Sequence, residues 1–257
     1  MLAALTDRTY IVTGASRGFG LAITEALLEA GANVGMIARN NEHLQHTVTG
    51  LNTDQVVGIA GDVADTEQMT AAFNRIKDHF GGLNGLVNNA GLARPGDVEN
   101  LRLEDVQLQI NTNFVGTVFC CQAAIPLLRG QDNPRIINMS SASAWHYDEM
   151  RHLSIYAATK AAVERFTRDL HLELQAQGIG VSCVRPGAAD TSFADGWDAE
   201  RLMAGIAAWQ DSGPTMNTGM TVRQVADAVL YCLAAPAGMT IDLLEVRPNT
   251  PTEKLKI

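Results

Sequence analysis

The segment from Thr13 to Gly20, TGASRGFG, constrains this chain more than any other. It follows the apolar run YIV and precedes LAITEALL, in which apolar residues recur at helical spacing. Glycines allow a tight turn, a close approach of backbone to ligand and close packing of helix on strand. At such a turn, backbone N–H groups and the N-terminus of the following helix favour the binding of a phosphate group. The segment predicts a strand–turn–helix unit that binds phosphate; an ordinary glycine-rich loop is the alternative.

Short apolar runs alternate with helical patterns along the whole chain. The runs that predict strands span residues 9–13, 33–38, 56–61, 85–89, 135–140, 180–185 and 241–246. The patterns that predict helices span 18–30, 42–51, 66–80, 103–128, 154–177 and 221–234, the last with a capping box. Such alternation implies parallel strands covered on both faces. We predict an α/β fold: one domain over residues 1–257, a doubly wound (Rossmann-type) parallel seven-stranded sheet with helices on both faces.

Residues 192–219 interrupt this alternation with a connection much longer than an ordinary loop. Its apolar residues follow a helical rhythm in the middle: Phe193, Trp197, Leu202, Met203, Ile206, Trp209 and Met216. At the carboxyl edge of a parallel sheet, such an insertion predicts a substrate lid. A packed surface excursion without a ligand is the alternative.

Composition excludes several classes of function. The formal net charge of −9 disfavours nucleic acid and anionic membranes as partners. No run approaches the roughly 18 apolar residues needed to cross a bilayer, and the N-terminus lacks the features of a signal peptide. The four cysteines form no C-x-x-C pair, and no histidine or cysteine spacing predicts a metal site. We expect a cytoplasmic protein with reduced thiols.

Tyr156 and Lys160 form a Y-x-x-x-K pair on the predicted helix 154–177. Residues four apart share one face of a helix. An ammonium group beside a phenol stabilises the phenolate and lowers the tyrosine pKa from about 10. The pair therefore predicts a tyrosine that exchanges protons near neutral pH. Ser140 and Ser141, which follow the strand 135–140, place hydroxyl groups at the carboxyl edge of the sheet, or serve only as turn residues.

Taken together, these motifs resemble those of the short-chain dehydrogenase/reductase family. The glycine segment fits T-G-x-x-x-G-x-G, residues 88–91 read NNAG, and residues 186–191 fit P-G-x-x-x-T. The family's catalytic asparagine matches Asn113, and its tyrosine and lysine match Tyr156 and Lys160. The likeness runs from about residue 9 to about residue 191.

The resemblance implies roles for four catalytic residues. Tyr156 would exchange a proton with the substrate oxygen while hydride moves at a nicotinamide, and Lys160 would also hold the nicotinamide ribose. Ser141 would polarise the substrate carbonyl, and Asn113 would anchor a water that relays protons. Most relatives place the serine thirteen residues before the tyrosine, which fits Ser143. We choose Ser141, because it stands in the strand-end motif, and expect a loop two residues longer than usual.

The cofactor that the resemblance implies is NADP(H). NAD-preferring relatives end the second strand with an acidic residue, whereas here Ala38 stands there and Arg39 follows. Arg17 and Arg39 suit a 2′-phosphate. The expected cofactor-binding residues are Gly14, Ser16, Arg17, Gly18, Phe19, Gly20, Arg39, Asn40, Asp62, Val63, Asn89, Ala90, Gly91, Tyr156, Lys160, Pro186, Gly187, Ala189 and Thr191.

The predicted activity is the NADP-linked interconversion of a secondary alcohol and a ketone or aldehyde. A redox sensor or scaffold that binds the dinucleotide without turnover is one alternative, and a lyase or epimerase is another. The residues expected to form an apolar substrate pocket are Trp145, Tyr147, Phe193, Trp197, Met203 and Trp209. Arg94 and Arg151 are candidates for holding a carboxylate instead. The resemblance implies a homodimer or homotetramer formed through the helices 103–128 and 154–177.

Overall fold

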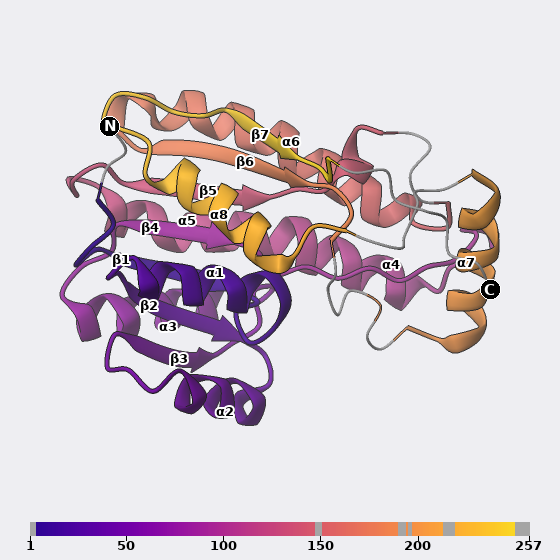
Figure 1. The fold of residues 1–257 in the computed structure, drawn as a ribbon, viewed down its shortest axis with the longest axis horizontal. Coiled ribbons are helices and arrows are strands. Elements are labelled where there is room, and N and C mark those ends of the chain that lie inside the picture. The colour runs from indigo at the N-terminus through magenta and orange to yellow at the C-terminus, as the bar shows by residue number, and fades with distance from the viewer. Residues whose placement is uncertain (1–3, 147–150, 190–193, 195–196, 213–218, 250–257) are drawn as a thin grey trace.

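A computed structural model of the chain describes residues 4–146, 151–189, 194, 197–212 and 219–249. Seven strands form one parallel sheet in the order β3-β2-β1-β4-β5-β6-β7. They are β1 (Thr9–Thr13), β2 (Asn33–Ala38), β3 (Val56–Ala60), β4 (Gly85–Asn88), β5 (Arg135–Met139), β6 (Gly180–Pro186) and β7 (Leu243–Val246). This sheet, with helices on both faces, confirms the predicted doubly wound fold (Figure 1).

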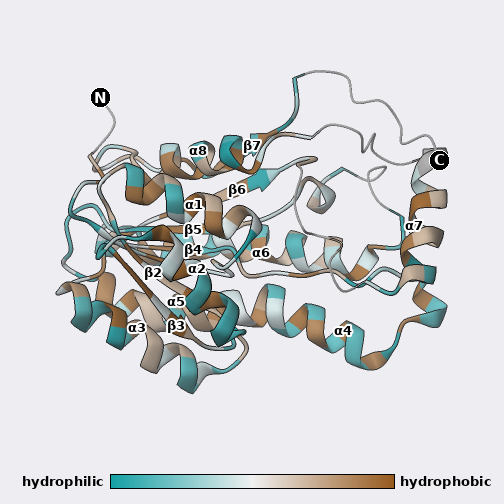
Figure 2. Cartoon of the chain, turned by 60° about the horizontal axis from the view of Figure 1, so that its bottom comes forward, coloured by the Kyte–Doolittle hydropathy of each residue, from teal (hydrophilic) through white to brown (hydrophobic). Residues whose placement is uncertain are grey.

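Two hydrophobic cores lie on opposite faces of the sheet. One is closed by α1 (Gly18–Glu29), α2 (Asn41–Leu51) and α8 (Val222–Leu233), and the other by α3 (Thr66–Phe80), α5 (Gly116–Leu128) and α6 (Ser154–Leu174). In Figure 2 the strands are mainly hydrophobic, whereas hydrophilic residues gather on the outer turns of the helices. The continuous apolar runs in the strands follow from this double coverage.

The predicted helix 103–128 is the main departure from the expected elements. The structure divides it into α4 (Leu103–Ile110), a π-helical turn (Asn111–Val115) and α5. The apolar pattern continues through the turn, so periodicity alone does not reveal it. The last strand is also shorter than predicted, because β7 begins at Leu243. The predicted capping box is present, with Thr221 and Gln224 bonding each other's backbone N–H groups.

Residues 192–219 contain one described helix, α7 (Ala199–Ser212). Figure 1 places it beyond the carboxyl ends of the strands, beside α4. An ion pair of 2.9 Å between Arg201 Nη1 and Asp105 Oδ2 joins α7 to α4. The helical rhythm read from the sequence therefore corresponds to a helix at the ligand-binding edge of the sheet.

The glycine turn is joined to the end of β4 through Thr13 and Asn89. The Thr13 hydroxyl accepts hydrogen bonds from the backbone N–H groups of Asn89 (3.1 Å) and Ala90 (3.0 Å). In return, Asn89 Nδ2 donates to the carbonyl oxygens of Thr13 (2.9 Å) and Gly14 (3.2 Å). Gly14 has φ +62, and a Cβ there would lie 2.8 Å from the Ala90 Cα. The turn therefore requires glycine for both conformation and space.

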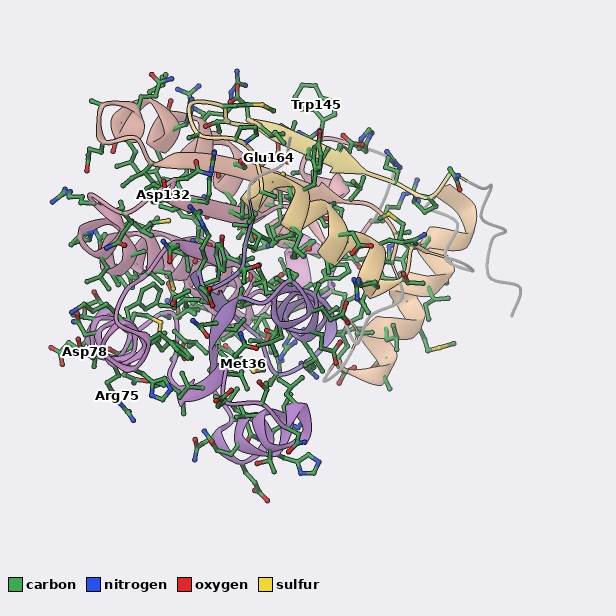
Figure 3. The ribbon with its side chains drawn as sticks, turned by 60° about the vertical axis from the view of Figure 1, so that its left-hand side comes forward. Met36, Arg75, Asp78, Asp132, Trp145 and Glu164 are labelled. Atoms are coloured by element: carbon green, nitrogen blue, oxygen red, sulfur yellow. The ribbon has the colours of Figure 1, made fainter. Side chains whose placement is uncertain are left out.

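Arg135, at the start of β5, binds the segment that connects α8 to β7. Its buried guanidinium donates to the carbonyl oxygens of Met239 (2.7 Å), Ala235 (2.7 Å) and Pro236 (2.9 Å). Arg135→Met leaves these acceptors unpaired, and we expect it to lower the free energy of unfolding by about 2–4 kcal/mol in urea titrations. The control Arg75→Met, on the exposed side of α3 in Figure 3, should change it by less than about 0.5 kcal/mol. Equal losses in both variants would contradict this role of Arg135.

Candidate active site

A cleft of about 910 Å³ opens at the carboxyl ends of the strands. Its walls come from the glycine turn, the end of β2, the loop after β4 and the start of α6. The expected residues that line it are Gly14, Ser16, Arg17, Gly18, Phe19, Arg39, Asn40, Val63, Asn89, Ala90, Gly91, Tyr156 and Lys160. The structure therefore brings the predicted phosphate turn and the Y-x-x-x-K pair to one cavity, as the switch in strand order between β1 and β4 predicts.

The other expected residues lie outside the cleft wall: Gly20, Asp62, Asn113, Ser141, Pro186, Gly187 and Ala189. Thr191 lies outside the described residues. Gly20 supports the turn from behind, because a Cβ there would collide with the Gly14 carbonyl oxygen. Gly187 instead donates its backbone N–H to the Val246 carbonyl, 2.8 Å away.

Arg94 and Ser140, considered above for binding a carboxylate and as a strand-end hydroxyl, also line the cleft. The remaining lining residues were not expected: Ile37, Ala38, His43, Gly61, Leu92, Thr112 and Met139. His43 is one that sequence reasoning missed. It lies in the first turn of α2, and its backbone N–H donates to the N-cap Asn40 (3.0 Å). The position of this turn directly after the second strand is the signal that identifies it.

Tyr156 is buried at the inner end of the cleft and shares a side-chain hydrogen bond with Ser141. Ser143 lies behind Ser141, and its hydroxyl donates to that of Ser141 over 3.0 Å. Of the two candidate serines, Ser141 is thus the one bonded to the tyrosine. Burial raises the pKa of Tyr156 to about 12, and the Ser141 hydrogen bond opposes this rise. The phenol is therefore protonated at neutral pH.

Lys160 lies beside Tyr156, with Nζ 5.8 Å from the centre of the tyrosine ring. It donates a hydrogen bond of 2.8 Å to the Met139 carbonyl at the end of β5. Burial lowers the pKa of Lys160 to about 8. The expectation that the ammonium lowers the tyrosine pKa is wrong for this structure, because loss of hydration on burial is the largest influence on the pKa of both groups. The predicted neighbourhood of the two side chains is confirmed.

Asn113 stands behind the loop that follows β4, in the π-helical turn. Its side chain accepts from the Leu92 N–H (2.8 Å) and donates to the Leu92 carbonyl (2.8 Å) and to the Thr159 hydroxyl (3.0 Å). A Cβ on Gly91 would lie 3.4 Å from Asn113 Oδ1 and 3.3 Å from Lys160 Nζ. Asn113 therefore positions the wall of the cleft against α6, and π-helical turns occur frequently at functional sites.

A buried charge network supports the same region from the other side. Arg185 Nε donates to Glu164 Oε1 over 2.7 Å, and its Nη1 donates to Glu245 Oε2 over 2.7 Å. Glu164 also accepts a hydrogen bond of 2.6 Å from the Ser140 hydroxyl. These bonds join α6 to the ends of β5, β6 and β7. They fix the helix that carries Tyr156 relative to the strand end that carries the serines.

The aromatic residues expected in a substrate pocket divide into two groups. Trp209 is buried in a cluster with Tyr156, against which Trp197 packs. Trp145 and Met203, by contrast, are 61% and 53% exposed, so their assignment to the pocket is wrong. Trp145 points away from the molecule in Figure 3, with its ring near the Arg185 guanidinium. Tyr147 and Phe193 lie outside the described residues.

The opposite end of the cleft carries positive charge. Arg17 is the N-cap residue of α1, and Arg39 and Asn40 follow β2. All three line the cavity together with the first turn of α2. A guanidinium pair beside two helix N-termini favours a phosphate group.

Neither a membrane-spanning helix nor a cluster of metal ligands occurs in the described part of the chain. None of its helices is both long and apolar enough to span a membrane. It also holds no group of three histidine, cysteine or acidic side chains arranged to bind a metal ion.

The sequence comparisons agree with this geometry. The family model for the short chain dehydrogenases matches residues 8–202. The chain belongs to the short-chain dehydrogenase family. An uncharacterized oxidoreductase of Staphylococcus aureus (strain USA300) is 31% identical over 247 residues, which cover 96% of this chain and 100% of that protein.

Solved structures show the same relationship. A serine dehydrogenase in its closed form, complexed with NADP⁺, superposes with a TM-score of 0.82 at 28% identity. The alignment covers 93% of this short-chain dehydrogenase and 94% of that chain. A short chain dehydrogenase from Burkholderia cenocepacia J2315 in complex with NADP gives a TM-score of 0.81 at 32% identity, covering 95% and 97%. The family places this protein among the oxidoreductases.

The buried Lys160 predicts a pH dependence of stability. Burial lowers its pKa from 10.5 to about 8, so between these values the unfolded chain binds more protons than the folded one. Stability from this group therefore rises with pH. Relative to Lys160→Met, the free energy of unfolding of the wild type should rise by about 1 kcal/mol between pH 8 and 9 in urea titrations. Lys77→Met, at a largely exposed side chain, serves as control. If the difference in the free energy of unfolding between the wild type and Lys160→Met does not change with pH, the prediction is contradicted.

Proposed function

We propose that this short-chain dehydrogenase is an NADP(H)-dependent oxidoreductase that interconverts a secondary alcohol and a ketone or aldehyde, acting on CH–OH donors with NADP as acceptor. The observation that supports this most directly is the buried Tyr156 hydroxyl, bonded to Ser141 beside Lys160 at the inner end of the cleft. A protonated phenol and a neighbouring hydroxyl are the groups that a carbonyl oxygen needs as it gains negative charge.

In reduction, the Ser141 hydroxyl would donate to the carbonyl oxygen, and Tyr156 would transfer its proton to that oxygen as the alcohol forms. In oxidation, the same proton would return to the tyrosine. Lys160, held by the Met139 carbonyl, would offset the charge on the phenolate. Asn113 would hold the wall of the cleft in place and anchor a water that relays protons. The bound nicotinamide supplies or accepts the hydride.

The residues at the outer end of the cleft fit NADP(H). Gly14 lets the turn pack closely on Ala90, and the backbone N–H groups at the start of α1 would bind the pyrophosphate. Arg39 is exposed, and no ion pair of its guanidinium occurs among the described residues. Arg17 and Arg39 would bind the 2′-phosphate. The NADP complexes of the two similar structures support the same choice.

Replacement of the tyrosine tests the chemistry. Tyr156→Phe removes the transferable proton, so we expect the kcat for NADPH-dependent ketone reduction to fall by about 10²–10⁴-fold. NADPH binding, followed by fluorescence, should stay within about threefold, because the ring is retained. The control Tyr231→Phe, at an exposed site on α8, should keep full activity.

Full turnover in Tyr156→Phe contradicts the assignment of Tyr156 as the proton donor. Tight NADPH binding without turnover on any of a broad panel of carbonyls favours the redox sensor.

Replacement of Arg39 tests the cofactor. Arg39→Ala removes a charge-assisted hydrogen bond to the 2′-phosphate, so the KM for NADPH should rise by about 10–100-fold. The KM for NADH, which lacks that phosphate, should change little. A parallel loss with both cofactors in steady-state kinetics would contradict 2′-phosphate recognition by Arg39.

We also propose a cytoplasmic homodimer or homotetramer. The free, buried cysteines Cys120, Cys121, Cys183 and Cys232 support a reducing compartment. Exposed apolar side chains on the two helices expected at the interface support assembly. They are Leu103 and Ile110 on α4 and Leu172 on α6.

A further inference from the structure

Three arginines surround one buried carboxylate where α4 meets α7. Asp105 has a side chain 6% exposed, and its Oδ2 accepts hydrogen bonds from Arg102 Nε (2.8 Å) and Arg201 Nη1 (2.9 Å). These bonds lower the pKa of Asp105, so it is a carboxylate at neutral pH. Arg94 Nε is 3.9 Å from Oδ1, too far for a hydrogen bond. The negative charge of Asp105 therefore lies close to the Arg94 guanidinium, but no N–H group of that guanidinium donates a hydrogen bond to it.

Of these three arginines, Arg94 is the one that lines the cleft. Its backbone N–H donates to Gln109 Oε1 over 3.1 Å, and its Nη1 donates to the Ala93 carbonyl over 3.0 Å. Gln109 is fully buried and is itself held by the Asp105 carbonyl (3.1 Å). The guanidinium is thus positioned by buried partners rather than carried on a free surface side chain.

Arg94 shares the cleft with the reacting group of the proposed function, and the residue before it packs near that group. Ala93, whose carbonyl holds the guanidinium, belongs to the buried cluster that contains Tyr156 and Trp209. Leu92, one residue earlier, is bonded to Asn113 behind the cleft. A substrate whose carbonyl oxygen meets Tyr156 would therefore occupy the cleft that Arg94 also lines.

A guanidinium carries five N–H donors in a planar fork that matches a carboxylate. In the described residues, one hydrogen bond from the Arg94 guanidinium is present, the bond to Ala93. The side chain is 24% exposed, so most of its surface is already removed from water. A partly buried guanidinium with unused donors binds an anion more strongly than a solvated one does.

We propose that Arg94 binds a carboxylate of the substrate, and that this enzyme therefore acts on short oxo acids and the corresponding hydroxy acids. This inference rests on the proposed oxidoreductase function and narrows its substrate class. The carboxylate would pair with the guanidinium while the ketone oxygen is bonded by Ser141 and Tyr156. An uncharged ketone of the same size would leave the partly buried guanidinium without this partner.

The test compares short oxo acids with their methyl esters. The panel contains 2-oxo, 3-oxo and 4-oxo acids. Each methyl ester keeps the ketone of its acid but lacks the negative charge. The ratio of kcat/KM for acid over ester should be about 10–100 in the wild type for at least one pair, and close to one in Arg94→Met. Arg102→Met removes the same charge from the same cluster, but at a side chain outside the cleft wall, and should keep the wild-type ratio. A ratio near one in the wild type, or one unchanged in Arg94→Met, overturns the proposal.

A binding measurement separates this inference from the proposed function. Calorimetric titration of the NADP⁺-loaded protein with the oxo acids and their methyl esters measures binding without turnover, because the ketone and NADP⁺ are both in the oxidised state. We expect the acid to bind more tightly than its ester in the wild type, and equally in Arg94→Met. Arg94-dependent binding without turnover of any oxo acid would retain the carboxylate site and reject the oxidoreductase. Turnover of esters and acids alike would retain the oxidoreductase and reject the carboxylate site.

Discussion

The cleft depends on one joint, between the threonine that ends β1 and the asparagine that follows β4. At this point the strand order reverses, so the segments leaving the two strands diverge and open a cavity. The hydroxyl of Thr13 and the amide of Asn89 each satisfy backbone groups of the other segment. Without these bonds, both loops would expose unpaired N–H and carbonyl groups in a half-buried place. The close glycine contacts described above are possible only because the joint fixes the separation of the loops.

Burial shifts the pKa values of the two central side chains in opposite directions. Both the phenol of Tyr156 and the amine of Lys160 shift toward their neutral forms. The same low-dielectric surroundings strengthen every hydrogen bond made there. The surrounding charges are placed further out, in the Glu164–Arg185 pair on one side and the Asp105 cluster on the other. These pairs join the elements around the reacting groups, α6 to β6 in the first case and α4 to α7 in the second.

The parts of the site that sequence reasoning predicted are those fixed by local chemistry. The glycine spacing of residues 13–20 requires a turn between strand and helix, and a four-residue spacing brings Tyr156 and Lys160 together. Features that depend on tertiary packing were not predictable. The hydrophobicity of Trp145 suggested that it forms a wall of the substrate pocket. Its ring instead lies on the surface, close to the Arg185 guanidinium. The shift of the tyrosine pKa depends on how deeply the helix is buried, which no local pattern records.

The π-helical turn has a consequence for how this part of the chain tolerates change. One extra residue in a helical turn advances the side chains that follow by about 100° relative to a regular α-helix. The two flanking helices are thus out of phase: α4 presents one set of residues to α6, and α5 packs on α3 from another direction. Deleting a single residue between 111 and 115 would restore a regular helix and rotate either Gln109 or Cys120 out of its buried position. The packing of the two helices therefore fixes the number of residues in this turn.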